Sequence, residues 1–254
     1  MILRNALYAI YARRLRRQLA GGPMPKHVAL VIDGNRRWAK QVGLANPSLG
    51  HKAGAEHIER VLEWSADLGI RHVTIFVASL DNLRKRGDDE VRFLMELVEA
   101  VITERLVHRR GRWQVRVAGR LDALPDSTAY ALKHAVDLTA ERDTDSEVTI
   151  AIGYDGRTEI ADAFRSLLDD AARHGRSLED LAQTITPDDL AAHLYTSGQP
   201  DPDLVIRTSG ERRMSSFLLW QAARSELYFC DVYWPGFRYV DFLRALRSYA
   251  ARSR

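Results

Sequence analysis

The stretch HVALVIDGNRRW, residues 27–38, decides the fold of this chain. Its first six residues are mostly branched and apolar, which predicts a buried strand. The strand ends at the carboxylate of Asp33, and Gly34 starts a turn into a helix-like segment that carries Arg36 and Arg37. In an open α/β sheet, ligands bind at the carboxyl ends of the strands. The stretch therefore indicates an α/β sheet with a binding site at its edge.

The residue types at this strand end suit a metal ion and a phosphate group. Asp33 can hold a divalent cation, and the guanidinium group of Arg37 can clamp a phosphate. The helix that follows also offers unpaired N–H groups to an anion. The arrangement suggests a Mg²⁺-diphosphate site, although a DGN turn that caps a helix explains this motif equally well.

Strand-like and helix-like segments alternate along the rest of the chain. Strands are predicted at residues 27–32, 72–78, 113–118, 147–152 and 203–206, with a sixth at 227–232. Helices are predicted at residues 53–68, 89–108, 127–141, 159–174, 187–194 and 240–251. This rhythm predicts an α/β fold: a single domain with a mainly parallel central sheet of about six strands and helices on both faces.

The composition is typical of a globular protein without a large nucleic-acid surface. Hydrophobic residues make up 46% of the 254 residues and charged residues 28%, while the net charge is only +3. Basic residues cluster at positions 13–17, 105–112 and 207–213, which favours local anion sites over nucleic acid. The single Cys230 excludes an intrachain disulfide and favours a reducing, cytoplasmic compartment. No apolar run approaches the roughly 20 residues of a membrane span, and no signal-peptide pattern opens the chain.

A basic helix is predicted at residues 2–19, and we set residues 1–24 apart from a domain of residues 25–254. Leu3, Leu7 and Ile10 lie along one side of this helix, and arginines crowd its later half. Arg14 falls on the apolar side at about 100° per residue, so the amphipathic pattern is imperfect. Two interpretations remain: a helix resting on an anionic membrane, and the favoured one, a helix packed on its own domain with a solvated basic face.

Three further motifs place polar residues at the ends of predicted elements. In GHKAGA, residues 50–55, His51 can bind or protonate a phosphate oxygen at a helix start, although an isolated histidine there is more often a cap or a surface residue. In SLDN, residues 79–82, Asn82 can orient a substrate and Ser79 can relay a proton, unless both simply form a turn. In DLVIRTSGERRMS, residues 203–215, two arginines and several hydroxyls can cradle a second diphosphate, with surface ion pairs as the alternative.

Together these motifs resemble those of one enzyme family. HVALVIDGNRRWAK, LGHKAGA, SLDN, DLVIRTSGERRMSSFLLWQ and SELYF occur in the order found in cis-prenyltransferases, the undecaprenyl diphosphate synthase family. The resemblance extends from residue 25 to residue 249, and several independent motifs match at the right separations. The stretch YTSGQPDPDLVIRTSGE is further similar to the actinobacterial short-chain branch, which includes Z,E-farnesyl diphosphate synthases.

The resemblance implies the cis-prenyltransferase fold, a homodimer, and a Mg²⁺-dependent enzyme that joins isopentenyl diphosphate to an allylic diphosphate (geranyl, dimethylallyl or farnesyl). It implies catalytic roles for Asp33, Asn82, Ser79 and His51. It implies substrate binding by Gly34, Asn35, Arg36, Arg37, Trp38, Lys85, Arg86, Arg207, Arg213 and Ser215, and metal binding by Asp33 and Glu226. The chain also lacks DDxxD, as this family does.

A growing prenyl chain needs an apolar channel, which we expect between the second strand and the helix after it. The candidate lining residues are Ile75, Val77, Phe93, Leu94, Leu97 and Val101. Val77 occupies a position that is small in long-chain relatives, and its stiff branched side chain should block a longer product. The resemblance to the short-chain branch and this block together imply products of about three isoprene units, C15, made from geranyl or dimethylallyl diphosphate.

The chain departs from the family pattern in a few places and leaves alternatives open. In the SxEN motif the acidic residue is Asp81, with Leu80 before it, and Leu83 replaces a frequent tryptophan. Pro47 replaces an arginine, and Arg84, Lys85 and Arg86 are all candidates for one basic position. The sequence ends at Arg254 without the usual Arg-x-Gly. The alternatives are a medium- or long-chain polyprenyl diphosphate synthase, a non-catalytic partner subunit, irregular coupling of the lavandulyl type, and an RNA-binding protein. The intact SLDN and IRTSGERR motifs favour ordinary head-to-tail elongation.

Overall fold

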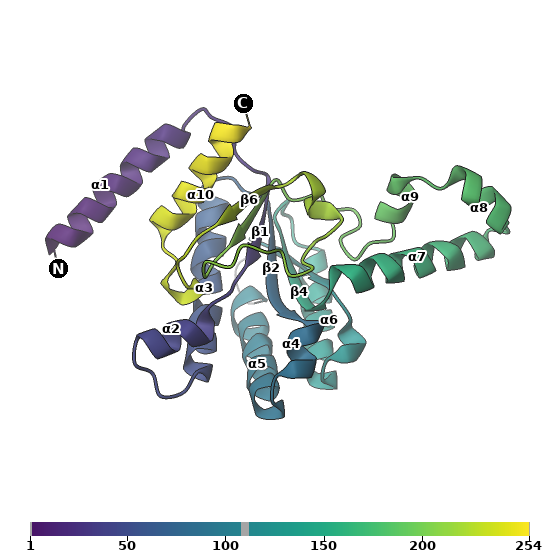
Figure 1. Ribbon diagram of the computed structural model, residues 1–254, viewed down its shortest axis with the longest axis horizontal. Helices are drawn as coiled ribbons and strands as arrows, with labels where there is room; N and C mark the ends of the chain where they lie inside the picture. Colours follow the sequence, from purple (N-terminus) through teal and green to yellow (C-terminus); the bar gives the residue numbers. More distant parts are fainter. Residues whose placement is uncertain (1, 108–111, 254) are drawn as a thin grey trace.

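The computed structural model describes residues 2–107 and 112–253, and its centre is a six-stranded sheet (Figure 1). All neighbouring strands are parallel, in the order β3-β4-β2-β1-β5-β6. The strands are β1 (His27–Val31), β2 (His72–Ser79), β3 (Gln114–Ala118), β4 (Glu147–Tyr154), β5 (Leu204–Arg207) and β6 (Glu226–Phe229). The predicted parallel sheet of about six strands is confirmed.

The central strands are buried on both of their faces. All five residues of β1 and all four of β5 are buried, whereas β6 at the edge is partly exposed. A parallel strand that is covered on both faces reads as a continuous apolar run, because neither set of alternating side chains meets water. This is why the stretch before Asp33 was such a strong signal in the sequence.

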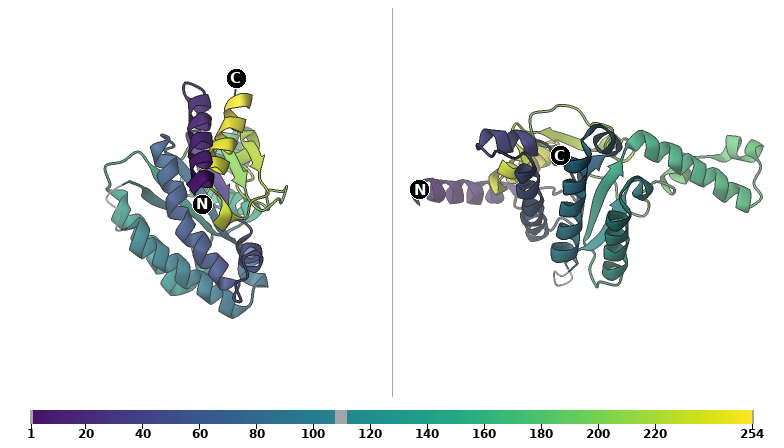
Figure 2. Two further views of the ribbon diagram at one scale, coloured as in Figure 1. Left: turned by 90° about the vertical axis from the view of Figure 1, so that its left-hand side faces the viewer. Right: turned by 90° about the horizontal axis from the view of Figure 1, so that it is seen from below.

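One face of the sheet is covered by long helices. These are α3 (Ser48–Asp67), α5 (Asp88–Val101), α6 (Asp126–Ala140) and α10 (Tyr239–Arg252) (Figures 1 and 2). Their apolar faces join Val28 and Leu30 of β1 in one large core. The regular spacing of apolar residues in α3, α6 and α10 is the pattern that predicted helices at residues 53–68, 127–141 and 240–251.

The opposite face lacks such a helical layer in the described part of the chain. Ala29 and Val31 of β1 pack there against Phe217 and Leu218, which belong to the irregular segment between β5 and β6. The Phe217 ring stacks on Phe76 with centroids 4.7 Å apart. The expectation of helices on both faces is therefore not met, because an irregular segment with one 3-10 turn, η3 (Gln221–Arg224), covers this face.

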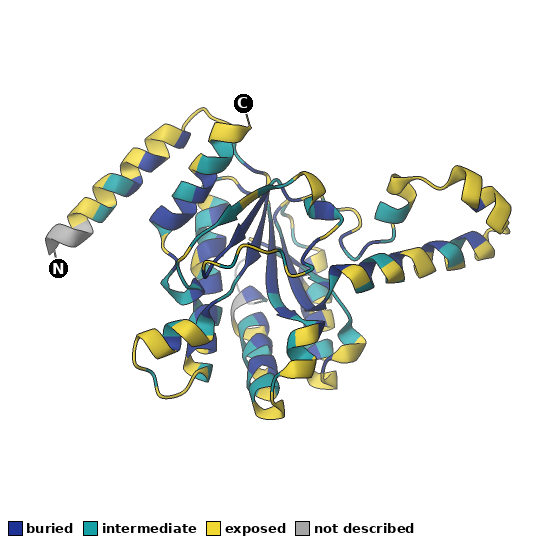
Figure 3. Cartoon of the chain, in the orientation of Figure 1, coloured by how far each residue is buried: buried dark blue, intermediate teal, exposed yellow. Residues whose placement is uncertain are grey.

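Three helices form an arm that extends from the body (Figures 1 and 2). They are α7 (Gly156–Arg173), α8 (Leu178–Thr184) and α9 (Pro187–Ala191). A small cluster of Leu167, Ala171 and Leu181 holds α7 and α8 together, while most other residues of the arm are exposed (Figure 3). The capping boxes at Ser177 and Thr186 start the two short helices.

The N-terminal helix α1 (Ile2–Leu19) packs along α10 (Figure 2). Leu15 and Leu19 are buried in the contact, and the hydroxyl of Tyr8 accepts a hydrogen bond from the backbone N–H of Val240, 3.2 Å away. Leu7 and Ile10, part of the apolar side noted in the sequence, are instead exposed. No helix in residues 2–107 and 112–253 has the length and apolar character needed to cross a membrane.

Several helix boundaries differ from those predicted. α3 begins at Ser48 rather than residue 53. The predicted helix 89–108 is realised as α5 followed by a π-helical turn, η1 (Ile102–Leu106), and its predicted last residue lies outside the described residues. The short helices α2 (Asn35–Gln41) and α4 (Leu80–Lys85) follow β1 and β2, and two further 3-10 turns are η2 (Leu121–Ala123) and η4 (Trp234–Gly236).

Candidate active site

Three of the four sequence motifs meet at the carboxyl edge of the sheet. Val31 is level with Phe76 of β2 and with Arg207 of β5, so the residues that follow these strands converge. The first turn of α3 brings His51 to the same place. A cavity of about 830 Å³ opens here, and residues of all four motifs line it. The tertiary arrangement therefore joins segments that are far apart in the sequence.

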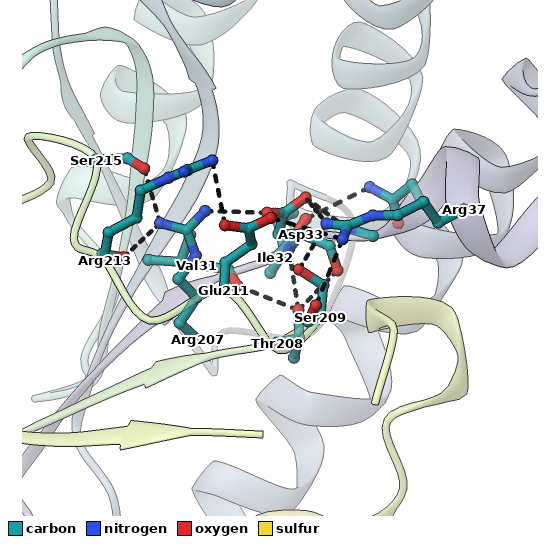
Figure 4. Close-up of polar contacts among 12 residues, drawn as sticks. Val31, Ile32, Asp33, Arg37, Arg207, Thr208, Ser209, Glu211, Arg213 and Ser215 are labelled. Carbon is teal, nitrogen blue, oxygen red and sulfur yellow. Dashed lines mark hydrogen bonds and ion pairs between the residues drawn. The ribbon is translucent and has the colours of Figure 1, made fainter. Parts of the chain in front are cut away.

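Asp33 lies at the centre of this edge between two guanidinium groups (Figure 4). Its Oδ2 accepts a hydrogen bond from Arg207 Nη2 at 3.0 Å, and its Oδ1 accepts one from the Gly34 N–H at 2.7 Å and lies 3.4 Å from Arg37 Nη2. Burial alone would raise the pKa of the Asp33 carboxyl, but the hydrogen bond and charge of Arg207, together with Arg37, hold this pKa below its ordinary value. Asp33 is therefore a carboxylate at neutral pH.

Gly34 is required by the turn that places Asp33. Its φ is +101°, in the left-handed region, and a Cβ atom there would lie 2.7 Å from the Tyr233 ring and 3.0 Å from Ser209. Any other residue would thus meet both backbone strain and a steric clash. The sequence motif DGN therefore starts the helix at Gly34, without a side-chain cap, and fixes the position of the Asp33 carboxylate.

The guanidinium group of Arg207 bonds mainly to other protein groups of the site. Arg207 is 4% exposed, and its Nη1 donates to the Ser215 hydroxyl at 2.7 Å and to the carbonyl of Arg213. These bonds hold a segment in which Ser209, Ser215 and two later residues have positive φ. Such conformations are costly for non-glycine residues and persist only where the surroundings enforce them. Arg207 is thus the group that links this segment to Asp33.

Glu211 is a site residue that sequence reasoning missed. Its carboxylate lies 3.7 Å from Arg37 and 3.2 Å from Arg213, so it connects the first motif to the fourth (Figure 4). Arg37 also donates to the Ser209 hydroxyl at 2.8 Å. Within RTSGERR the glutamate looks like an ordinary turn residue, and only the fold shows that it neutralises two arginines of the cavity.

Glu90 is a second missed residue, and it lies behind the cavity lining, beside the basic residues His51, Arg36 and Arg86. Its carboxylate is 3.3 Å from His51 Nε2, 3.5 Å from Arg36 and 3.5 Å from Arg86. Burial and the charge of Arg86 lower the pKa of the His51 imidazole, although the Glu90 carboxylate opposes this shift. The helix α5 is thereby tied to α2 and α3 at the cavity mouth.

The glycines of GHKAGA serve helix packing rather than an open anion site. A Cβ on Gly50 would lie 2.2 Å from the Asn35 carbonyl oxygen, and one on Gly54 would lie 2.4 Å from the Asn35 side chain. The N–H of Gly50 already donates to the carbonyl of Pro47 at 3.0 Å. These small residues thus let α3 approach α2 closely.

Ser79 and Asn82 combine a structural role with a position in the cavity. The Asn82 N–H donates to Ser79 Oγ at 2.9 Å, which caps α4. Both residues line the cavity. The turn-forming interpretation of SLDN therefore holds, and it leaves the Asn82 side chain at the site.

Some residues assigned from the family pattern are not among those that line the cavity. Lys85 pairs with Asp81 at 2.6 Å in solvent, whereas Arg86 lines the cavity. Trp38 lies against Gly236. Glu226 begins β6 at the opposite end of the sheet and pairs with Arg252. By strand register Glu226 is level with Val28, roughly 16 Å from the Asp33 end at about 3.3 Å per residue. One chain alone therefore does not bring Glu226 to Asp33.

The cavity has a cationic mouth and an apolar interior. The charged lining groups are Asp33, Arg36, Arg37, Lys40, Arg86, Arg207, Glu211 and Arg213. The apolar lining includes Ile58, Phe76, Val77, Leu94, Leu97, Val98, Val101, Ile102, Leu106 and Ile150, but neither Ile75 nor Phe93 of the expected channel. Val77 is the unpaired residue of a β-bulge in β2, and bulges re-aim side chains near active sites. The geometry suits an amphiphile with a strongly anionic head and a hydrocarbon tail.

The donor set fits a magnesium ion that is shared with a bound diphosphate. Residues 2–107 and 112–253 contain no group of three histidine, cysteine, aspartate or glutamate side chains placed to enclose a metal ion. Mg²⁺ often binds through one or two carboxylates and completes its shell with water and substrate phosphates. Asp33, ionised and facing the cationic mouth, fits that mode of binding.

The chain is similar to a protein-family model, to curated proteins and to a solved structure. Residues 31–254 match the family model of undecaprenyl diphosphate synthases. An isoprenyl transferase of Streptomyces fradiae is 63% identical over 98% of the chain and 97% of its own length. A (2Z,6E)-farnesyl diphosphate synthase of Thermobifida fusca is 52% identical over 100% of the chain and 98% of its own length. A solved structure of lavandulyl diphosphate synthase from Lavandula x intermedia in complex with dimethylallyl diphosphate has a TM-score of 0.83 at 33% identity and covers 91% of this chain and 97% of its own.

Proposed function

The chain belongs to the undecaprenyl diphosphate synthase family of prenyltransferases, and we propose that it condenses isopentenyl diphosphate with a short allylic diphosphate to give a Z-prenyl diphosphate such as (2Z,6E)-farnesyl diphosphate. The observation that carries this proposal is one continuous cavity of about 830 Å³ with an arginine-rich mouth and an apolar interior. The diphosphate groups of the two substrates match the arginine-rich mouth, and the hydrocarbon chain matches the apolar interior.

We assign the two diphosphates to different sides of the mouth. Arg36, Arg37 and Arg86, with His51, lie beside the entrance to the apolar interior and suit the allylic diphosphate. Arg213 and Ser215 lie on the segment after β5 and suit isopentenyl diphosphate. Arg207 positions that segment, since its guanidinium is occupied by Ser215, the Arg213 carbonyl and Asp33.

Asp33 would hold Mg²⁺ together with diphosphate oxygens. When bound, the ion would neutralise negative charge on the departing diphosphate. The arginines of the mouth supply the same kind of stabilisation from fixed positions, at no cost of reorganisation. The allylic C–O bond breaks as the double bond of isopentenyl diphosphate attacks the allylic carbon, and one proton is then lost. The departing diphosphate accepts this proton, and we assign Asn82 and Ser79 to orient it, because both line the cavity at the end of β2.

We propose a C15 product, in line with the relatives named (2Z,6E)-farnesyl diphosphate synthase. Val77 lines the cavity two residues before Ser79, so its branched side chain narrows the channel near the mouth. Irregular coupling, suggested by the lavandulyl synthase as structural neighbour, is the weaker alternative, because that protein is the more distant in sequence.

We also propose a homodimer. The edge strand β6 has a free side, and Leu227 on it is 37% exposed. The arm adds the exposed apolar residues Phe164 and Leu178. A second copy covering these surfaces would also give Glu226, which lies at the opposite end of the sheet from the Asp33 of its own chain, a place at the dimer interface.

The test is incubation with Mg²⁺, isopentenyl diphosphate and each of dimethylallyl, geranyl and farnesyl diphosphate, followed by sizing of the products. We expect a C15 product with a Z double bond from geranyl diphosphate. Absence of turnover with all three primers would contradict the proposed reaction, and C50 or longer products would contradict the proposed length.

A further inference from the structure

A second, smaller cavity adjoins the apolar interior of the first. This second cavity, of about 20 Å³, lies between α3, the π turn η1 and the start of β3. Ile58, Val101 and Leu106 line both cavities, so they form the wall between them. A channel that holds a growing hydrocarbon chain can be no deeper than this wall.

We propose that Leu106 is the floor of the channel, that Arg142 positions it, and that this pair sets the greatest length of product. The inference rests on the proposed prenyltransferase reaction and names the residue that limits chain growth. It differs from the narrowing by Val77, because Val77 precedes Ser79 at the mouth whereas Leu106 lies at the far end.

Leu106 owes its position to the π turn. Ile58 and Val101 belong to regular α-helices, but Leu106 is the last residue of η1, where Val107 N–H bonds to the carbonyl of Ile102 at 3.0 Å. A π turn inserts one residue relative to the α-helix and so rotates the side chains that follow, and it occurs often at functional sites. Leu106 is 6% exposed and thus buried between the two cavities.

Arg142 holds this turn from outside the channel. Its Nη1 donates to the carbonyl of Leu106 at 3.1 Å and to that of Trp113 at 2.7 Å, and its Nη2 donates to the carbonyl of Val107. The last carbonyls of a helix have no partner within the helix, and a cation is favourable there. Arg142 thereby fixes the end of η1 relative to β3, and it lines the second cavity behind Leu106.

The first test replaces the floor. Leu106→Ala should merge the two cavities and shift products from C15 toward C20 and longer, with farnesyl diphosphate becoming a better primer. Leu132→Ala is the matched control, because Leu132 is a fully buried leucine of α6 that lines neither cavity. If Leu106→Ala destabilises the protein too far, Leu106→Val provides a smaller truncation with the same expected direction. Unchanged product lengths in a folded Leu106 variant, or equal lengthening in Leu132→Ala, would overturn the proposal.

The second test separates positioning from general stability. Arg142→Met should broaden the product lengths while leaving kcat for the first condensation within about threefold, because the mouth is untouched. Arg142→Lys retains one cationic donor and should restore part of the narrow distribution. A fall in kcat with no change in product length would reduce Arg142 to a purely structural role and contradict the proposal.

A binding experiment distinguishes failure of the floor from failure of the proposed reaction. The affinity of a non-reactive thiolodiphosphate analogue is measured by calorimetry for C15 and C20 chains, without turnover. Leu106→Ala should bind the C20 analogue at least tenfold more tightly than the wild type while binding a C10 analogue equally. Equal C20 affinities would contradict the floor even if the enzyme is active, and a shifted C20 affinity would support it even if the assigned substrates are wrong.

Discussion

The carboxylate of Asp33 is balanced by Arg207 and Arg37 and lies at the carboxyl end of the central strand. These two guanidinium groups keep it ionised, because they outweigh the cost of burying the charge. Mg²⁺ is usually bound by one or two carboxylates together with substrate phosphates, and two diphosphate substrates would supply such phosphates beside Asp33.

We expect Asp33→Asn to lower kcat at least about a hundredfold while the protein stays folded, since metal-assisted charge stabilisation supplies several kcal/mol. Steady-state kinetics with Mg²⁺ and circular dichroism test this. Asp81→Asn is the control, because Asp81 follows β2 at the same edge but pairs with Lys85 in solvent. Wild-type turnover in Asp33→Asn would remove this residue from its assigned role.

The two arginines after β5 should behave differently, although sequence alone gave them the same role. Arg213 is 69% exposed at its side chain, so Arg213→Ala should raise the KM for isopentenyl diphosphate roughly tenfold or more, by loss of a contact worth about 1.5–3 kcal/mol, and leave stability unchanged. Arg207→Ala removes one partner of a buried ion pair and should lower the free energy of unfolding by about 3 kcal/mol. Urea unfolding measures the stability of both variants, and steady-state kinetics measures their KM. An equal loss of unfolding free energy in the two variants would contradict these different roles.

At the scale of elements, the contact between α2 and α3 sets the shape of the allylic side of the mouth. Gly50 lies against the Asn35 backbone, so an added methyl group has no space without moving α2. We expect Gly50→Ala to cost about 1–3 kcal/mol of stability by overpacking and to raise the KM for the allylic substrate more than that for isopentenyl diphosphate. Thermal melts and kinetics test this.

Gly87→Ala is the matched control for this contact. Gly87 precedes α5, and a Cβ there would meet no atom within 4 Å. It should leave both stability and substrate affinities near the wild-type values. If Gly50→Ala behaves like Gly87→Ala, then the close approach of the two helices is not required for the site.

At the scale of the whole molecule, two buried histidines make stability depend on pH. Burial lowers the pKa of His27 and of His57 to about 4, against 6.5 in an exposed histidine. The unfolded chain therefore binds more protons between pH 6.5 and about 4, so stability is greatest above pH 6.5 and is lost as the pH falls through this window. We expect a loss of about 2 kcal/mol for each histidine at pH 5.

Urea unfolding at pH 7.5 and pH 5 measures this loss. His57→Phe, which keeps an aromatic ring beside Trp64 and Trp234, should reduce the pH dependence by about half. His174→Gln serves as the control, because the side chain of His174 is 69% exposed on α7. A pH dependence that is the same in all three proteins would show that other groups cause it.

Assembly belongs to the same scale. Light scattering at micromolar concentration should give twice the 28.8 kDa mass of the chain. Leu227→Asp on the edge strand should shift the mass toward that of one chain, since a charge on an edge strand opposes pairing. A mass of 28.8 kDa for the wild type would contradict the dimer.

The amino-acid sequence alone predicts the strands and a mainly parallel sheet, because strands that are buried on both faces read as continuous apolar runs. The order of the strands comes from the structure. The sequence also places Asp33 and Asn82 shortly after strands and Arg207 at the end of a strand, as the structure does. These signals are local, and a parallel sheet carries them to one edge by its register.

Which charged groups pair at that edge depends on the three-dimensional fold. Glu90 and Glu211 become site residues because their helix and turn bring them to arginines from other motifs, and Glu226 is placed at the opposite end by the parallel register of β6. The depth of the channel was equally hidden, because it depends on a π turn whose carbonyls are held by Arg142 from another helix end. Pairings and cavities of this kind arise from packing between distant segments, for which no local pattern exists in the sequence.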